Sequence, residues 1–434
     1  MRRTLIHPRD EIMRTMERIY RYRMTTTSGG NLSIREPNGD IWITPARIDK
    51  GNLRREDIVC VHADGKVEGL HKPSSEFPFH KAIYADRPDL RAIVHAHPVA
   101  LVAFSICRQV PNTRLLYQSR TICGKVGFTP YALPGSTKLG RNIAASFKEG
   151  FDCIILENHG VVTGGTDLQN AFERFETLEF TAKTVIKAGI LGPVRYLTNR
   201  QLQQPSQVQP CARQFSPAPA SSREKELRKG ICEFVHRAYQ QRLMISTEGA
   251  FSARLDRDSF LITPHRVDRS AVTVEDIVLV RKGVPEKGRV PSSATRNHLA
   301  IYARHPEFQA IVNAYPVNAT AFSVSNAELD SRTIPESYLF LRDVKRLPAG
   351  LQFQDGKALA AQVSPTQPVA LFENDGVLIC GTSILDAFDR LEVLESTAEA
   401  MINSRPIGAM VPMSEAVIEE LLTAFFPNEK RKKK

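Results

Sequence analysis

The sequence has no long hydrophobic run and no paired cysteine motif. Its 434 residues contain no apolar run of about 18 residues, the length that a membrane-spanning helix requires. The polar start Met1-Arg2-Arg3 lacks the apolar segment of a signal peptide. The seven cysteines are an odd number without CxxC spacing, which is typical of reduced thiols rather than of a disulfide framework. These absences predict a cytoplasmic protein.

Acidic residues are fewer than basic residues, at 47 Asp and Glu against 58 Lys and Arg, so the net charge is +11. Five of these positive charges are the last five residues, Lys430 to Lys434. A frayed and solvated end is the simpler interpretation of this tail, and contact with an anionic surface is the alternative. No aromatic residue interleaves with the tail to stack on bases, so we expect no nucleic-acid partner.

Two histidines, His95 and His97, stand two residues apart in the apolar run at 93–99. The run predicts a buried strand, and because side chains alternate along a strand, both imidazoles should point to one face. Two imidazoles on one rigid face form half of a divalent-metal site. A hydrogen-bonded pair of core histidines is the alternative. The segments Pro-Ser-Ser-Glu at 73–76 and Glu-Asn-His-Gly at 157–160 favour the metal, because they add a carboxylate and a third imidazole.

Hydrophobic periodicity predicts an α/β chain. We expect helices at 8–24, 76–85, 137–148 and 168–188, and strands at 41–45, 57–62, 93–99 and 152–156. Ser74 or Ser75 is expected to cap the second helix. The segment 200–222 contains no acidic residue and much Gln, Ser and Pro, a composition that is typical of a linker.

After this segment the sequence repeats itself. The motif from Thr44 recurs from Thr263, and the apolar strand from Ile93 recurs from Ile311. Near-constant offsets of this kind indicate two copies of one domain. We therefore expect a first domain at 1–199, a linker at 200–222, a second domain at 223–427 and a basic tail at 428–434.

The two copies differ where a metal and its neighbouring acid would lie. Residues Glu76, His95, His97 and His159 correspond to Ala294, Asn313, Tyr315 and Asp375. The apolar and turn residues around these positions are kept. Histidines that only pack would not be expected to change as a set, so the second copy is predicted to keep the shape without the metal ligands.

Four motifs, in this order and at this spacing, resemble those of the class II aldolase/adducin family. They are Gly-Gly-Asn-Leu-Ser from Gly29, Pro-Ser-Ser-Glu from Pro73, His-Ala-His-Pro from His95 and Glu-Asn-His-Gly from Glu157. The resemblance covers 8–190 well and 225–403 in degenerate form. It implies two tandem α/β/α layered domains, each around a mainly antiparallel sheet. It also implies a homo-oligomer, because the family forms four-fold rings with active sites between subunits.

By matching positions, the resemblance implies a zinc ion held by His95, His97 and His159, one per chain in the first domain. Another divalent metal is the alternative. Glu76 would be the acid/base residue beside the ion. Its structural alternative is an acidic residue that favours the dipole at a helix N-terminus.

The resemblance also implies residues for substrate and for a neighbouring site. Five residues lie where the family binds substrate phosphate: Ser28, Gly30, Asn31, Ser74 and Ser75. Turn and cap chemistry would equally explain them. Tyr131 matches a family tyrosine that reaches into a neighbouring active site, so it is a catalytic candidate. Counting back from Asp375 places its counterpart at Leu347, so the second copy is predicted to lack this tyrosine.

The implied function is that of a zinc-dependent lyase of the class II aldolase type. It would cleave or form a carbon–carbon bond in a small phosphorylated ketose through an enediolate. Three neutral histidines leave the charge of the ion undiminished and one coordination position open. A sugar-phosphate 4-epimerase or dehydratase on the same site is one alternative. A non-catalytic adducin-like scaffold is another, and the intact ligand set opposes it.

Overall fold

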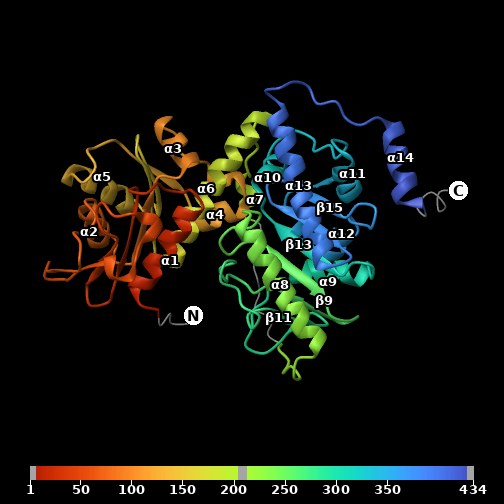
Figure 1. Ribbon diagram of the computed structural model, residues 1–434, viewed down its shortest axis with the longest axis horizontal. Helices are drawn as coiled ribbons and strands as arrows, with labels where there is room; N and C mark the ends of the chain where they lie inside the picture. The colour runs from red at the N-terminus through yellow and green to blue at the C-terminus, as the bar shows by residue number, and fades with distance from the viewer. Residues whose placement is uncertain (1–5, 204–212, 428–434) are drawn as a thin grey trace. The chain divides into compact units, whose positions relative to one another are not determined.

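The computed structural model describes residues 6–203 and 213–427, and the chain divides into two compact units (Figure 1). The first unit is Met1–Arg114 with Gln118–Lys183, and the second is Leu115–Tyr117 with Thr184–Lys434. The basic tail at 428–434 lies outside the described residues. No helix in the described part of the chain is long and apolar enough to cross a membrane. The linker and the exact domain bounds stay predictions.

The first unit is built on an eight-stranded sheet in the order β4-β3-β2-β1-β5-β8-β7-β6. Among these strands β6 and β7 are parallel, and the other neighbours are antiparallel. The strands are β1 Asn31–Arg35, β2 Ile41–Ile43, β3 Val59–Val61, β4 Val67–Glu68, β5 Ala92–Ala96, β6 Val126–Thr129, β7 Cys153–Leu156 and β8 Gly160–Gly165. The mainly antiparallel sheet predicted from the resemblance is therefore confirmed.

Helices cover both faces of this sheet. They are α1 Pro8–Arg21, α2 Phe77–Asp86, α3 Val99–Ile106, α4 Tyr117–Cys123, α5 Thr137–Lys148 and α6 Leu168–Leu191, with short 3₁₀ helices at Lys50–Asn52, Arg55–Asp57 and Thr113–Leu115. Along β5, Val94 packs in the core with apolar residues of α1 and α6, whereas Ile93 packs with those of α2 and α5. This alternation confirms the α/β/α layering.

The start of α2 differs from the prediction in a way that matters for the site. Neither Ser74 nor Ser75 is the N-cap residue; that place belongs to Glu76, whose side chain makes no capping hydrogen bond. Instead, the backbone N–H of Glu76 donates to Ser74 Oγ at 3.2 Å. The serine thus orders the turn before the helix, and the Glu76 carboxylate is left to point elsewhere.

The second unit repeats the same strand order, β12-β11-β10-β9-β13-β16-β15-β14. Its strands are β9 Ala250–Arg254, β10 Ser259–Ile262, β11 Val278–Arg281, β12 Val284–Pro285, β13 Ala310–Ala314, β14 Lys345–Leu347, β15 Val369–Phe372 and β16 Val377–Gly381. Its helices are α7 Asn199–Leu202, α8 Ser222–Gln240, α9 Thr295–Arg304, α10 Val317–Ser323, α11 Pro335–Leu341, α12 Gly356–Ala360, α13 Ile384–Ser404 and α14 Glu415–Phe425, with a 3₁₀ helix at Leu351–Phe353. Two sheets of identical order confirm the tandem duplicate.

The register of the parallel edge strands corrects one alignment. Thr129 ends β6 and Leu347 ends β14, and each occupies the same place against the neighbouring strand. Leu347 is therefore the counterpart of Thr129, and Tyr131 corresponds to Ala349. The sequence prediction, which counted back from Asp375, placed the counterpart of Tyr131 two residues too early. The reason is that the segment that follows this edge strand is shorter in the second copy. The conclusion that the second copy lacks the tyrosine is unaffected.

Candidate metal centre

His95 lies on β5 with its side chain fully buried. Its Nδ1–H donates to the backbone oxygen of Val161 on β8 at 2.9 Å. A donor at Nδ1 leaves the lone pair on Nε2, the nitrogen that faces the candidate site. The pairing of two central strands thus fixes both the tautomer and the direction of this ring.

His97 follows the end of β5, and His159 lies in the turn between β7 and β8. His97 Nε2 lies 3.2 Å from His95 Nε2, and one ring nitrogen of each of the three histidines lies within 4.8 Å of the others. Two nitrogens bound at about 2.0–2.1 Å to a tetrahedral ion would be about 3.3 Å apart. The turn is held by the His159 N–H, which donates to Ser105 Oγ at 2.9 Å. The three rings therefore fit one divalent ion.

Two glycines allow the backbone to approach this strand. Gly30 has a φ of 73°, and a Cβ there would lie 2.6 Å from the backbone oxygen of His95. A Cβ on Gly160 would lie 2.6 Å from the backbone oxygen of Ala96 and from the ring of His97. Side chains at either position would displace the strand that carries the ligands.

Glu76 completes the site from the start of α2. Its carboxylate is buried, with Oε2 3.2 Å from His95 Nε2 and 2.7 Å from Asn31 Nδ2, which donates to it. Its Oε1 lies 3.5 Å from His159 Nε2 and has no hydrogen-bond partner among the described residues. A buried carboxylate oxygen without a donor, beside converging ring nitrogens, is what a cation site requires.

The electrostatics favour neutral imidazoles at two of the three positions. Burial and the neighbouring His95 lower the pKa of His97 to about 3 and that of His159 to about 4. Burial also acts on His95, but the negative charge and hydrogen bond of Glu76 outweigh it and raise the pKa of that ring. For Glu76, burial raises the pKa, yet the charges of His95 and His159 hold it well below its usual range. A metal ion would take the place of the proton between His95 and Glu76.

A hydrogen-bond network behind the site was not predicted from the sequence. His80 Nε2–H donates to Asn31 Oδ1, and His80 Nδ1 accepts from Ser33 Oγ at 2.7 Å. Ser33 Oγ also lies 2.7 Å from the hydroxyl of Tyr84. Burial, with His95 nearby, lowers the pKa of His80 to about 3, so this ring is neutral. The network holds the Asn31 amide that in turn holds Glu76.

A sequence signal for this network exists in the repeat. Ser33, His80 and Tyr84 recur as Ser252, His298 and Tyr302, and the second copy forms the same bonds. His80 is completely buried. Ser33 is the last residue of the Gly-Gly-Asn-Leu-Ser motif, whereas Tyr84 lies in no motif, and neither position by itself indicates a contact with His80.

The other predicted site residues lie around this centre. Ser28 and Ser75 are exposed, whereas Gly30, Asn31 and Ser74 are buried. The glycine turn packs against the site, since a Cβ on Gly29 would lie 3.0 Å from His97 Nδ1. Asn31 uses its amide to hold Glu76, a role additional to the predicted phosphate contact. The assignment of these five residues to phosphate stays a prediction.

The predicted tyrosine is on the surface of the first unit. Tyr131 is 55% exposed, and its backbone N–H donates to the carboxylate of Glu157 at 2.8 Å. Its side chain is available to another subunit, and its catalytic role stays a prediction.

The corresponding place in the second unit is closed by internal hydrogen bonds. Asn313 Oδ1 accepts from His298 Nε2 at 2.7 Å. Asp375 Oδ2 accepts from Gln352 Nε2 at 2.6 Å, and burial raises the pKa of this carboxyl to about 6. Asn313 Oδ1 and Asp375 Oδ2 are therefore paired within this unit where the first unit has imidazoles, whereas Asp375 Oδ1 has no hydrogen-bond partner among the described residues.

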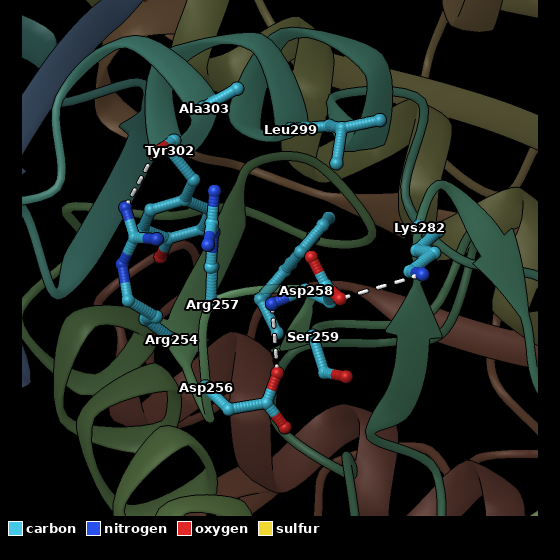
Figure 2. Close-up of a pocket in the computed structure, with 10 residues that line it drawn as sticks. Arg254, Asp256, Arg257, Asp258, Ser259, Lys282, Leu299, Tyr302 and Ala303 are labelled. Carbon is cyan, nitrogen blue, oxygen red and sulfur yellow. Dashed lines mark hydrogen bonds and ion pairs between the residues drawn. The ribbon is translucent and has the colours of Figure 1, made fainter.

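A pocket of about 140 Å³ lies elsewhere in the second unit (Figure 2). Its polar side chains are engaged with one another: Lys282 Nζ lies 3.6 Å from Asp258, and Arg254 donates to the backbone oxygen of Tyr302 at 2.7 Å. None of its lining residues corresponds to the histidine site, so it does not compete as the functional centre.

Comparisons with known proteins agree with the motifs. A family model described as the Class II Aldolase and Adducin N-terminal domain matches residues 10–186 and again 229–402. The chain is 33% identical to 3-oxo-tetronate 4-phosphate decarboxylase of Escherichia coli (strain K12) over 196 residues, 44% of this chain and 91% of that protein. It is 35% identical to L-fuculose phosphate aldolase of Methanocaldococcus jannaschii over 178 residues, 41% and 94% of the two chains. A solved structure of L-fuculose 1-phosphate aldolase is 30% identical, with a TM-score of 0.41, over 45% of this chain and 92% of that one.

Proposed function

This chain belongs to the class II aldolase and adducin family, and from that premise we propose that its first domain is a metal-dependent lyase. The reaction breaks or forms a carbon–carbon bond beside the carbonyl of a small phosphorylated ketose. The observation that supports this most directly is the convergence of three histidines on an unpartnered oxygen of Glu76. A scaffold protein has no physical need for that arrangement, and it is absent from the second copy.

The proposed ion is zinc, one per chain, held by His95, His97 and His159, with another divalent metal as the alternative. The three imidazoles would hold the ion while leaving it accessible to substrate. Bound there, the ion supplies Lewis acidity that stabilises the negative charge developing on the ketose oxygens as the bond breaks.

Glu76 is proposed to move the proton. Its depressed pKa keeps it a carboxylate, so it can accept a proton from the substrate and return it to the carbon that is left with the electron pair. Asn31 holds one carboxylate oxygen at 2.7 Å and leaves the other for the reacting groups. The glycine turn at Ser28 and Gly30, with the serines at 74 and 75, is proposed to bind the phosphate through N–H and hydroxyl groups.

The names of the relatives indicate two possible outcomes when a carbon–carbon bond beside a ketone is broken. An aldolase releases an aldehyde, and a decarboxylase releases carbon dioxide, but each leaves an electron pair beside a ketone. We propose testing L-fuculose 1-phosphate for aldehyde release and 3-oxo-tetronate 4-phosphate for carbon dioxide release. Epimerisation or dehydration would give a product with an intact carbon chain, and an adducin-like scaffold would turn over neither compound.

The first test is the substitution Glu76→Gln, which keeps shape and hydrogen bonding but removes basicity. Turnover should fall by about 100-fold or more, while metal content and melting temperature are kept. In His97→Ala the metal itself should be lost. His71→Ala is the matched control, since His71 pairs with Asp57 outside the site and its removal should leave the metal bound. A Glu76→Gln protein with normal turnover would contradict the assignment.

The remaining proposals concern the substrate class, the oligomeric state, the location and the basic tail. The substrate is a small phosphorylated sugar, and the chain is a homo-oligomer in the cytoplasm. The basic tail is proposed to be dispensable for turnover, because nothing in it matches the repeated domain.

A further inference from the structure

A second group of metal-ligating side chains lies on the opposite face of the first sheet. Ligand atoms of Asp40, Cys60 and His62 all lie within 4.8 Å of one another. Cys60 stands opposite Trp42 in the β2–β3 pair, and both belong to the core formed with α1. Because side chains alternate, Asp40 and His62 project from that same face. The face of His95 is the other one, where its ring meets Phe79 of α2.

The distances in this group match those around a tetrahedral ion. His62 Nδ1 lies 3.2 Å from Asp40 Oδ2 and 3.9 Å from Cys60 Sγ. Zinc bonds of about 2.0–2.3 Å imply separations of about 3.3 Å between nitrogen and oxygen and about 3.5 Å between nitrogen and sulfur. A shift of a few tenths of an ångström would bring His62 Nδ1 and Cys60 Sγ to this separation, and the Asp40 ligand oxygen lies within 4.8 Å of both atoms.

The orientation of His62 also suits a ligand. Its Nε2 lies 3.2 Å from Glu68 Oε2, so the Nε2–H donates to that carboxylate and the Nδ1 lone pair faces Asp40. A histidine that binds metal through one nitrogen commonly donates from the other to a carboxylate. A lone pair facing a carboxylate oxygen is repelled unless a cation lies between them. That cation is either a proton on His62 or a metal ion.

The charges around Cys60 point the same way. Its side chain is 1% exposed, and the carboxylates of Asp40, Glu68 and Glu36 all act on the thiol. Arg9 acts on this thiol with the opposite charge. A divalent ion would offset this excess of carboxylates and stabilise a thiolate.

The second copy has lost this group too. In the matching β10–β11 pair, Asp40, Cys60 and His62 correspond to Ser259, Leu279 and Arg281. Figure 2 shows Ser259 among the pocket residues, where its hydroxyl stands in place of the carboxylate. Glu286, at the place of Glu68, pairs with Arg228 at 3.1 Å. At the histidine centre and at this second group alike, the side chains that could bind a metal are therefore present in the first copy and absent from the second.

We propose that Asp40, Cys60 and His62 bind a second divalent cation of the thiophilic, zinc-like class, with Glu68 as the residue that positions His62. The site is separate from the histidine centre and does not depend on the proposed reaction. Binding releases the proton of the thiol, and the thiolate donates its electron pair to the ion.

Cobalt(II) tests the proposal, because a thiolate ligand gives cobalt an intense charge-transfer absorption in the near ultraviolet that imidazoles and carboxylates do not give. The metal-free full chain should develop this band on titration and lose it when zinc is added. Cys60→Ser and His62→Ala should abolish it. Glu68→Gln should weaken cobalt affinity by about tenfold without removing the band.

Two controls separate this site from others. His97→Ala removes the proposed catalytic ion and should leave the band intact, since that centre contains no sulfur. Cys107→Ser removes an exposed thiol and should also have no effect. Circular dichroism identifies any variant that fails to fold, and Asp40→Asn, which keeps the sulfur ligand, should weaken binding with the band still present. Absence of the band in the unsubstituted chain would overturn the proposal and leave a protonated His62 that bridges two carboxylates. Survival of the band in a folded Cys60→Ser protein would also overturn it, because the cobalt would then be bound by another cysteine.

Discussion

At the scale of single residues, the carboxylate of Glu76, the proposed acid/base residue, is held by groups that do not contact the proposed metal. Asn31 donates to Glu76, and His80 orients Asn31 through its Nε2–H. The hydroxyl of Ser33 donates to His80 Nδ1 on the other side of the ring. The position of Glu76 therefore depends on a fully buried and neutral histidine.

Replacing His80 by Phe should lower turnover with the metal still bound. The ring stacks on Phe79, so Phe keeps the packing, but Asn31 and Ser33 lose their partners, at a cost of about 1–3 kcal/mol each. The matched control is His298→Phe, which removes the same bonds in the second copy. Both variants should lose stability in denaturant titrations, and only His80→Phe should lose turnover. Equal turnover in the two would mean that Asn31 holds Glu76 unaided.

Asp375 makes the stability of the chain depend on pH. Burial raises its pKa from 3.8 to about 6, so between about pH 4 and 6 the folded state binds more protons than the unfolded state. Stability should therefore fall as pH rises through that window, by up to about 3 kcal/mol. Asp375→Asn should flatten this dependence and raise stability at pH 7. The free energy of unfolding of both proteins, measured by denaturant titration at about pH 4.5 and about pH 7, gives the difference. The same dependence of stability on pH in the two proteins would contradict the prediction.

At the scale of elements, helix α3 begins directly after His97 and has no side-chain cap of its own, since its N-cap residue is Pro98. The carboxylate of Glu179 on α6 supplies the missing acceptor, because the N–H groups of Ala100 and Leu101 donate to it. In the second unit Glu395 on α13 does the same for α10. In each unit the long helix, α6 or α13, thus fixes the start of the short helix that follows the central strand, α3 or α10.

Glu179→Ala should destabilise the start of α3 and leave the position of His97 less well fixed. The loss of a buried acceptor for two N–H groups should cost about 1–3 kcal/mol and weaken metal affinity. Lys183→Ala is the control, because it removes only the partly exposed ion pair with Glu179, a contact of less than about 1 kcal/mol. Metal titration of the two variants gives the comparison, and identical affinities would refute the coupling.

Much of this arrangement could be predicted from the sequence. The repeat predicted two equivalent sheets. The strand predicted at 93–99 was too long, because β5 ends at Ala96 and α3 begins at Val99, but His95 and His97 do converge, with their Nε2 atoms 3.2 Å apart. The rest depends on contacts between distant segments. Nothing local shows that Glu76 occupies the N-cap yet turns to His95, or that β6 runs parallel to β7. The Cys60 group was missed because Asp40 lies 22 residues from His62 in the sequence and no motif joins them.

At the scale of the whole molecule, one chain contains two equivalent domains, and one of them has the ligand set. If the four-fold ring implied by the family resemblance applies to this chain, two chains would fill its places with first and second copies alternating. A first copy would then face a second copy, which has Ala349 where the tyrosine would be.

This arrangement predicts little change in turnover for Tyr131→Phe. The phenol would face a domain without metal ligands and could not reach an active site. Turnover per bound metal, measured beside that of Glu76→Gln, decides the question. A loss as large as that of Glu76→Gln in a folded protein would show that first copies meet one another and that Tyr131 serves the neighbour.

The hydrogen bond between His298 and Asn313 has a consequence for anyone who would graft the centre onto the second domain. Importing only the three histidines and the glutamate would remove Asn313, the acceptor of the His298 Nε2–H. An amide is then needed at the place of Asn31, where this copy has Ala250. The smallest coherent transplant is Ala250→Asn, Ala294→Glu, Asn313→His, Tyr315→His and Asp375→His. An asparagine at position 250 must therefore be introduced together with the ligands. In the second copy His298 is hydrogen-bonded to Asn313, which is one of the residues that would be replaced.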